Sequence, residues 1–316
     1  MKTLNYAQKK QIKKIAASTM RYVFLIAFSY TLIYPVIFMI SSMLKSSLDY
    51  FDPTVQWVPK TWSLESIGLA IKAIDFWNSA SATLVNEIVA ALLAVASCMI
   101  TAYGLARFNY KYKNVLMGIL FLTMLVPPMI TVIPNYVNFK YLDFFGILGL
   151  LSKITGVELR PSILNTPLVF YIPSLLSVGL KNGFFIFIFH QFFKGLPKEL
   201  EEAAWIDGAG AWKTFLRVIL PSSGTSIITV LLFSVVWYWN DSVNASMFID
   251  APQTLRVKLS QLFGNASTDL VEGITSMNRG SVIMASFFLA IVPLLIFYII
   301  IQRKFISSIV NSGIVG

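Results

Sequence analysis

Cysteine and histidine are almost absent from this sequence, and their scarcity excludes most metal and thiol chemistry. Among 316 residues there is one cysteine, Cys98, and one histidine, His190. A lone cysteine excludes a disulfide within the chain and a cysteine-ligated metal site, and a lone histidine excludes zinc motifs with paired histidines. Cys98 lies in an apolar run and is interpreted as a small buried residue, and His190 as part of a helix interior. We expect no catalytic residue, no metal and no cofactor in this chain.

Two further shortages concern phosphate loops and charge. The sequence contains no Gly-Lys dipeptide, so it lacks the phosphate-binding loop of P-loop ATPases and is not expected to hydrolyse ATP. Charged residues make up 13% of the chain, whereas a soluble domain has about 25%. Hydrophobic residues make up 56% and fall into long blocks, which indicates an integral membrane protein. The net charge of +10 comes largely from basic residues beside these blocks, a pattern that favours membrane orientation over nucleic-acid binding.

Six apolar segments are long enough for transmembrane helices, which need roughly 20 residues each. The predicted fold is therefore all-α: a polytopic integral membrane protein with a basic tail over 1–21, a transmembrane domain over 22–302 and a second tail over 303–316. The six segments cover approximately 22–43, 79–105, 115–136, 164–193, 222–239 and 281–301.

Two of these segments contain breaks. The third is interrupted by Pro127-Pro128 and is expected to end near Pro134, and the fourth is expected to break around Pro173 and over 179–183. Backbone breaks at membrane depth are tolerated where protein or a water-filled cavity satisfies the freed polar groups. Both breaks are thus candidates for a cavity wall, with a simple packing kink as the alternative. The first half of the fourth segment is interpreted as an outer-leaflet helix or as part of one long broken helix, since two separate spans would move the following loop to the other side.

Six spans place both termini on the same side, and the basic residues identify that side as the cytoplasm. The tails and the two predicted cytoplasmic loops hold 15 of the 25 lysines and arginines. The predicted outer loops hold 10 of the 15 acidic residues. This distribution agrees with the positive-inside rule.

A polar island over 196–209 separates the fourth and fifth segments and predicts a short helix. Pro197 suits the first helical position, and three glutamates lie in or near the first turn, where they complement the helix dipole. Asp207-Gly208 ends the helix, because glycine can adopt the left-handed cap conformation. A second amphipathic helix is expected to follow. Its apolar stripe is Trp212, Phe215, Leu216 and Ile219. An amphipathic linker on the membrane surface is the alternative.

The island resembles a known family motif. Glu202-Ala203-Ala204, Gly208, Val218 and Leu220-Pro221 have the spacing of the "EAA" loop of ABC-importer permease subunits, with Val218 where that family usually has isoleucine. Three further stretches resemble the maltose-type carbohydrate-uptake permeases: Phe192 to Leu200, Ala102 to Phe108, and Trp239 to Asp241. In that family the loop, here about 194–221, holds the coupling helix that fits a cleft on the cytoplasmic ATPase. The resemblance assigns ATPase coupling to Glu201, Glu202, Ala203, Ala204, Asp207 and Gly208.

The resemblance also implies a function and partners. It implies a non-catalytic permease subunit in the plasma membrane of a prokaryote, which imports an oligosaccharide or related glycan by alternating access. The implied partners are a second homologous permease subunit, two ATPase subunits, an extracytoplasmic solute-binding protein and the lipid membrane. The tail from Ser307 to Gly316 lacks the first glycine and the lysine of the family pattern, so the resemblance does not establish a tail contact with the ATPase. Alternatives are another polar solute, an ion-coupled secondary transporter, and a non-transport scaffold.

Two groups of residues are candidates for the substrate pathway. The first lies at the outer end of the fifth segment: Trp237, Tyr238, Trp239, Asn240 and Asp241. Aromatic faces contact the C–H faces of a pyranose, and Asn and Asp bond its hydroxyls, although an interfacial aromatic belt is the alternative. The second is Glu87, an acid inside a predicted span, where such residues usually face a cavity or a partner.

Overall fold

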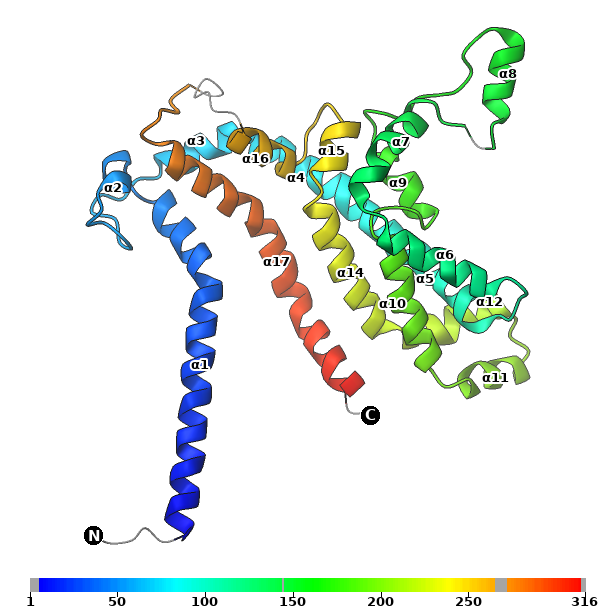
Figure 1. Cartoon of the computed structure of the whole chain (residues 1–316), viewed down its shortest axis with the longest axis horizontal. Coiled ribbons are helices and arrows are strands. Elements are labelled where there is room, and N and C mark those ends of the chain that lie inside the picture. Colours follow the sequence, from blue (N-terminus) through cyan, green and yellow to red (C-terminus); the bar gives the residue numbers. More distant parts are fainter. Residues whose placement is uncertain (1–5, 144, 265–271, 314–316) are drawn as a thin grey trace. The chain divides into compact units, whose positions relative to one another are not determined.

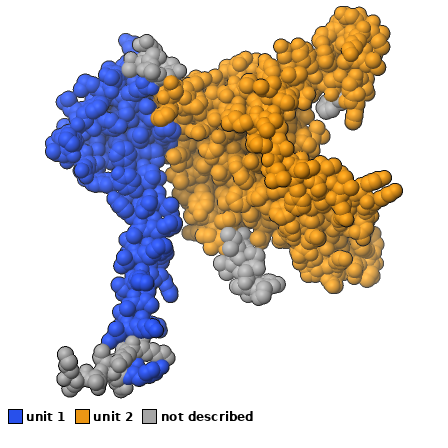
Figure 2. All heavy atoms as spheres, viewed as in Figure 1, with its two compact units in different colours: residues 1–73, 265–289 blue, residues 74–264, 290–316 orange. Residues whose placement is uncertain are grey.

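The computed structural model describes residues 6–143, 145–264 and 272–313. These residues form helices and one isolated β-bridge, between Lys45 and Trp62. The chain divides into two compact units, 1–73 with 265–289 and 74–264 with 290–316 (Figure 2), and each is described by itself. In chain order (Figure 1) the helices are α1 (Tyr6–Met43), α2 (Ser47–Phe51), α3 (Glu65–Ala73), α4 (Phe76–Thr83), η1 (Leu84–Ile88), α5 (Val89–Arg107), α6 (Lys113–Leu125), α7 (Pro128–Lys140), α8 (Ile147–Thr155), α9 (Leu168–Leu175), α10 (Asn182–Gly195), α11 (Glu199–Ile206), α12 (Ala211–Thr214), η2 (Phe215–Ile219), α13 (Leu220–Ser222), α14 (Gly224–Trp239), α15 (Val243–Phe248), α16 (Leu255–Gly264) and α17 (Arg279–Gly313).

The first unit contains α1, α2, α3 and the beginning of α17. Its small core comprises Met43, Ala70, Ile274, Val282 and Ala285. Most side chains of α1 are exposed, and apolar residues predominate from 22 to 40, which is the pattern expected where lipid covers a helix. The stretch predicted as a basic tail is helical from its sixth residue, so it is continuous with the first predicted span.

A buried lysine organises the loop after α1. The ammonium of Lys45 donates hydrogen bonds to the carbonyls of Val55 (2.8 Å) and Gln56 (2.9 Å). Nearby, the hydroxyl of Ser41 donates to the carbonyl of Trp57 at 2.7 Å. Burial lowers the pKa of Lys45, and the charge of the following acid, Asp49, opposes that shift. The loop that follows α1 therefore folds back toward the end of this helix, because its carbonyls at 55–57 accept hydrogen bonds from Ser41 and Lys45.

The second unit is built around one long helix. α4, η1 and α5 run without interruption from Phe76 to Arg107, and α5 packs against α9, α10 and α14. The side of α5 that meets these helices is lined by small, fully buried residues, and small residues let helix backbones approach closely in a membrane. They are Ala90, Ala91, Ala94, Cys98 and Ala102. The prediction that Cys98 is a buried apolar residue is confirmed.

The predicted break in the third segment is present, but the end of that segment was wrongly placed. α6 and α7 meet at an angle of 103° at Val126-Pro127, beside the predicted Pro127-Pro128 interruption. α7 then continues through Pro134 to Lys140. A proline inside a helix costs one backbone hydrogen bond and introduces a local clash. Here the helix persists, and α7 packs against α15.

The break in the fourth segment lies later than Pro173, which stands inside α9. The chain leaves the helix over 176–181, where Ser177 (φ 61°) and Lys181 (φ 59°) take left-handed conformations. Two glycines at this break serve close packing. A Cβ on Gly179 would lie 2.7 Å from the hydroxyl of Tyr238, and one on Gly183 would lie 2.7 Å from Thr123 Oγ1. These contacts favour the packing interpretation over a cavity wall at these two positions.

Within the part of the chain that the structure describes, three helices are long and apolar enough to cross a membrane: residues 11–43, 76–107 and 279–306. Two bent helix pairs also qualify: α6 with α7, and residues 211–222 (α12, η2 and α13) with α14. Counting each pair as one span raises the number to five. The remaining predicted span, the fourth, depends on α10, whose 14 residues cover about 21 Å, whereas the hydrocarbon core is about 30 Å thick. The all-α membrane fold is confirmed at this level, and the count of six stays a prediction.

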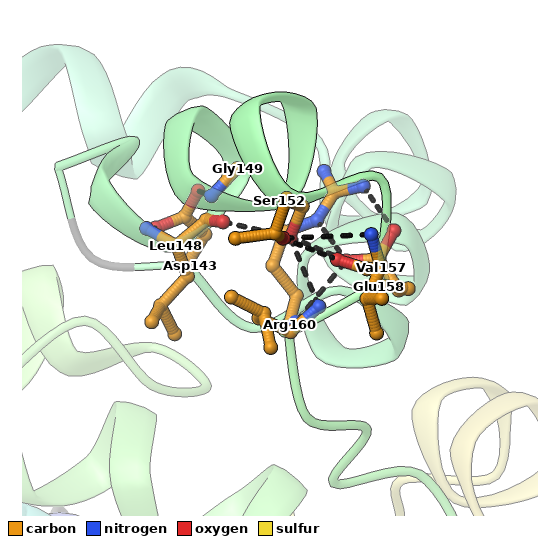
Figure 3. A network of polar contacts seen from close by, with 9 residues as sticks. Asp143, Leu148, Gly149, Ser152, Val157, Glu158 and Arg160 are labelled. Atoms are coloured by element: carbon orange, nitrogen blue, oxygen red, sulfur yellow. Dashed lines mark hydrogen bonds and ion pairs between the residues drawn. The ribbon is translucent and has the colours of Figure 1, made fainter.

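The sequence analysis missed α8, a helix within a predicted outer loop. Glycines with left-handed backbone, Gly146 and Gly156, flank it. The carboxylate of Asp143 accepts hydrogen bonds from the N–H groups of the first turn, at 3.0 and 2.8 Å, and an ion pair of 2.6 Å joins Glu158 to Arg160 (Figure 3). These bonds order the loop from within.

Candidate functional site

The polar island folds as two short helical limbs joined at a glycine. The first limb, α11, runs from Glu199 to Ile206, two residues later than the predicted start at Pro197. Gly208 has φ +77°, as predicted for a left-handed cap. Its N–H donates to the carbonyl of Trp205 (3.0 Å) and that of Ala209 donates to the carbonyl of Ala204 (2.9 Å), which together make a Schellman motif. The angle between the limbs is thus set at Gly208, where the left-handed backbone favours a residue without a Cβ.

The second limb is formed by α12, η2 and α13. Of its predicted apolar stripe, Phe215 and Ile219 are buried, whereas Trp212 and Leu216 remain exposed. The ring of Phe215 lies 5.0 Å from that of Tyr103 in α5 and 5.5 Å from that of Trp212. The limb therefore attaches to α5 by its inner face and leaves an apolar outer face uncovered.

The two limbs present a mixed surface. Of the six predicted coupling residues, four are exposed and Ala204 is partly exposed. The exposed four are Glu202, Ala203, Asp207 and Gly208. Trp205 and Ile206 add apolar area, and Ile206 is 87% exposed. Exposed apolar patches with a polar rim mark sites of interaction with proteins or membranes.

Glu201 is the exception among these six, because it points inward. Its carboxylate lies 2.9 Å from Nε of Arg107, and the two side chains are 4% and 7% exposed. Arg107 also donates from Nη2 to the carbonyl of Leu196 at 2.9 Å. Burial raises the pKa of Glu201, and the charge of Arg107 opposes that shift. The sequence analysis recorded Arg107 only as a member of a motif, because nothing local predicts a partner 94 positions away.

Glu87 lies in η1, the π-helical turn of the long helix, and is 1% exposed. η1 packs against α9 and α14. Among the described residues, both carboxylate oxygens of Glu87 lack a hydrogen-bond partner. Nearby, the hydroxyl of Tyr171 donates to the carbonyl of Val85 at 3.0 Å. π turns often occur at functional sites, and a buried acid without a partner is costly in a membrane.

The aromatic residues of the predicted lip are largely packed inside the unit. Tyr238 is fully buried and shares a 2.6 Å hydrogen bond with Ser174, and Trp239 is buried as well. Trp237 packs against phenylalanine rings of α10 and α14. Asn240 is exposed, with its side-chain amide donating to the carbonyl of Val236 at 2.8 Å. In this conformation Asn240 is the member of the group that is free to meet a solute.

Asp241 is partly buried, and its carboxylate is hydrogen-bonded to a residue three positions later. It accepts hydrogen bonds from the backbone N–H and the side-chain amide of Asn244, at 3.1 and 3.0 Å. Its structural role is to hold the turn that follows α14. The described residues contain no cluster of three His, Cys, Asp or Glu side chains suited to a metal ion.

A polar groove of about 580 Å³ lies beside α4 and was not predicted. It is lined by hydroxyl, amide, carboxylate and ammonium groups of α4, α16 and the segment that precedes α16. Its charged and amide residues are Asp75, Asn78, Asp250, Gln253 and Lys258. Groups of this kind hydrogen-bond to sugar hydroxyls. The groove could not be predicted from the sequence, because its lining residues come from two stretches, 75–81 and 250–258, that are far apart in the chain.

Residues 94–310 match the family described as "Binding-protein-dependent transport system inner membrane component". The chain is 26% identical over 315 residues to the "Probable ABC transporter permease protein YurM" of Bacillus subtilis, covering 98% of this chain and 92% of that relative. It is 25% identical over 272 residues to the "Probable starch degradation products transport system permease protein AmyC" of Thermoanaerobacterium thermosulfurigenes, covering 85% and 87%.

A solved structure shares the fold. It is titled "Crystal structure of a bacterial ABC transporter involved in the import of the acidic polysaccharide alginate". The superposition has a TM-score of 0.69 with 20% sequence identity, and it covers 96% of this chain and 100% of the other. The described helices of the present chain therefore follow an architecture that exists in a solved transporter.

Proposed function

The chain belongs to the family of binding-protein-dependent transport system inner membrane components, and on this premise we propose that it forms half of the translocation pathway of an ATP-driven importer for an oligosaccharide or related glycan. The observation that carries the proposal is the pair of limbs at Gly208, which lies within the matched range and exposes four of the six predicted coupling residues. The names of the similar permeases support the glycan class.

In the proposed mechanism the limbs are cytoplasmic and α11 seats in a cleft of one of two ATPase subunits. ATP binding closes the ATPase pair and moves α11, and this motion tilts the spans of this chain and of a second permease subunit. An extracytoplasmic binding protein delivers the glycan to the outer loops, and hydrolysis resets the cycle. ATP hydrolysis is thus assigned to the separate subunits. The domain limits 1–21, 22–302 and 303–316, the six spans and the cytoplasmic termini belong to the same proposal.

For the pathway, we assign the solute contact at the outer end of α14 to Asn240 first. The rings of Tyr238 and Trp239 are already occupied by packing in this conformation. Trp237 and Asp241 remain candidates in a conformation in which α14 has moved. The polar groove beside α4 offers a further surface with the hydrogen-bonding groups that sugar hydroxyls need.

Purification from native membranes, followed by reconstitution, tests the proposal. The tagged chain is expected to co-purify with a second permease and with nucleotide-binding subunits. In proteoliposomes supplied with the binding protein, uptake of labelled maltooligosaccharides is expected to require ATP and to resist an uncoupler. Uptake that persists without ATP and stops with the uncoupler would identify a secondary transporter. Co-purification without any nucleotide-binding subunit would favour a scaffold.

Labelling from outside intact cells tests the orientation. Asp207 is exposed, so Asp207→Cys gives a reactive thiol on the coupling surface, while the natural Cys98 is fully buried and serves as the unlabelled background. A membrane-impermeant maleimide is expected to label Asp207→Cys only after the cells are opened. Labelling of intact cells would place the limbs outside and would remove the ATPase from their reach.

A further inference from the structure

Arg107 joins three parts of the second unit through one side chain. It is the last residue of α5, its Nη2 donates to the carbonyl of Leu196 directly after α10, and its Nε faces the carboxylate of Glu201 in α11. The guanidinium thus combines one hydrogen bond, to Leu196, with one ion pair, to Glu201, and its planar shape fixes the direction of both, which an ammonium does not. Because both charged side chains are almost entirely buried, neighbouring water cannot easily replace either partner.

α11 reaches the helical bundle at few places, which gives this contact its importance. The limb packs on α12 and η2, its own companions in the island. The chain that leads into it, 196–198, lies outside any helix. The ion pair between Glu201 and Arg107 is a direct connection between α11 and α5.

The second limb is attached to the same turn of α5. Tyr103 lies one helical turn before Arg107, and its ring contacts Phe215 of η2 at 5.0 Å and Phe193 of α10 at 5.8 Å. Both limbs are thus held by the last turn of the helix around which the second unit is packed. A displacement of the limbs therefore acts first on that end of α5.

We propose that Arg107 is the positioning residue that transmits movement of α11 to α5, acting through its buried contact with Glu201. The inference rests on the proposed function, since it takes α11 to be the part that the ATPase moves. Arg107 fixes the limb to the bundle so that a movement of the limb becomes a tilt of α5 and not a local bend at 196–198.

The decisive variant removes both partners together. Arg107→Met with Glu201→Leu replaces the pair by apolar side chains of similar length and leaves no lone buried charge, a change that buried ion pairs often tolerate. Arg107→Lys keeps the charge but loses the planar fork. Lys111→Met removes an exposed basic residue four positions away and is the matched control.

The readouts are ATPase co-purification, the rate of ATP hydrolysis, and labelled maltooligosaccharide taken up per ATP hydrolysed in proteoliposomes. Because the Glu201 side chain is 4% exposed and lies outside the exposed coupling surface, we expect the double variant to keep the ATPase bound and hydrolysing ATP, while uptake per ATP falls at least about tenfold. Arg107→Lys is expected to fall in between, and Lys111→Met to match the unchanged protein. Arg107→Lys decides the question if the double variant does not reach the membrane.

Uptake per ATP equal to that of the unchanged protein, in the double variant or in Arg107→Lys, would overturn the proposal. Loss of the bound ATPase from either variant would also overturn it, because the pair would then serve docking and not transmission. Failure of the unchanged protein to bind an ATPase or to couple uptake to ATP would instead refute the proposed function. The two failures are therefore distinguishable.

Discussion

Substitution of Gly183 by alanine is a direct test of the packing at the break between α9 and α10. Gly183 lies in the first turn of α10, against α6, where an added Cβ would be 2.7 Å from Thr123 Oγ1 and 3.3 Å from Met124 Cγ. Thr123 cannot easily move away, because it is β-branched and its hydroxyl donates to the carbonyl of Leu120 at 2.7 Å. Gly118 in α6 is the matched control, since a Cβ there has no neighbour within 4 Å.

The magnitude follows from two opposing effects. Overpacking typically costs about 1–3 kcal/mol, and replacing glycine by alanine inside a helix gains about 1 kcal/mol. Gly118→Ala receives only the gain, so Gly183→Ala should be less stable than this control by about 1–3 kcal/mol. Thermal unfolding in detergent should place the midpoint of Gly183→Ala roughly 2–12 °C below that of the control.

Removal of the clashing hydroxyl provides the second half of the test. Thr123→Ala in the Gly183→Ala background should recover most of the lost stability, so the two substitutions should be strongly non-additive. Thr123→Ala combined with Gly118→Ala should show no such coupling. Equal unfolding temperatures for Gly183→Ala and Gly118→Ala, or additive effects in the cycle, would refute the close approach of α6 and α10.

Three further predictions concern the other sites. Gly208→Asp should lower ATP-driven uptake without reducing the amount of protein in the membrane, because the left-handed backbone at Gly208 disfavours a Cβ by about 1–2 kcal/mol. Gly210→Asp is the control, since φ is negative there, and it should lower uptake less. Equal uptake in the two variants would contradict this prediction. Asn240→Ala should impair uptake of bulky sugars, and unchanged uptake kinetics would restore the interpretation of an interfacial belt. The ion pair of Glu158 lowers the pKa of that carboxyl to about 2, below its ordinary 4.5, so its contribution to loop order should be complete above about pH 4.5 and should fade as the pH falls toward 2. A spin label at Lys153→Cys should gain mobility over that range, and mobility independent of pH would contradict the ordering role.

The local features of the chain were predictable from the sequence because each depends on neighbouring residues. The helix over the polar island and the left-handed glycine that ends it follow from capping preferences, which act within a few positions. The interruption at Pro127-Pro128 has the same origin. These features lie within one or two residues of their predicted places.

Features that depend on tertiary contacts were missed or misplaced. Pro134 and Pro173 both stand inside helices, although proline alone favours a break. Tyr238 looked like an interfacial or sugar-binding residue, but it is fully buried against Ser174. In each case the local sequence has the stated preference, and packing against a distant element outweighs it.

The same long helix links the two candidate sites. Glu87 and Arg107 lie 20 positions apart on the uninterrupted run from Phe76 to Arg107, a distance of about 30 Å at 1.5 Å per residue. α5 is packed closely through small residues, and close-packed interiors transmit strain. A tilt imposed at Arg107 should therefore displace the other end of the helix. At the π-helical turn the regular hydrogen-bond pattern changes, and there the carboxylate of Glu87 has no hydrogen-bond partner among the described residues. If α5 tilts during transport, the surroundings of Glu87 must change with it. A change in the environment of Glu87 would therefore show that movement of the limbs reaches this end of the helix.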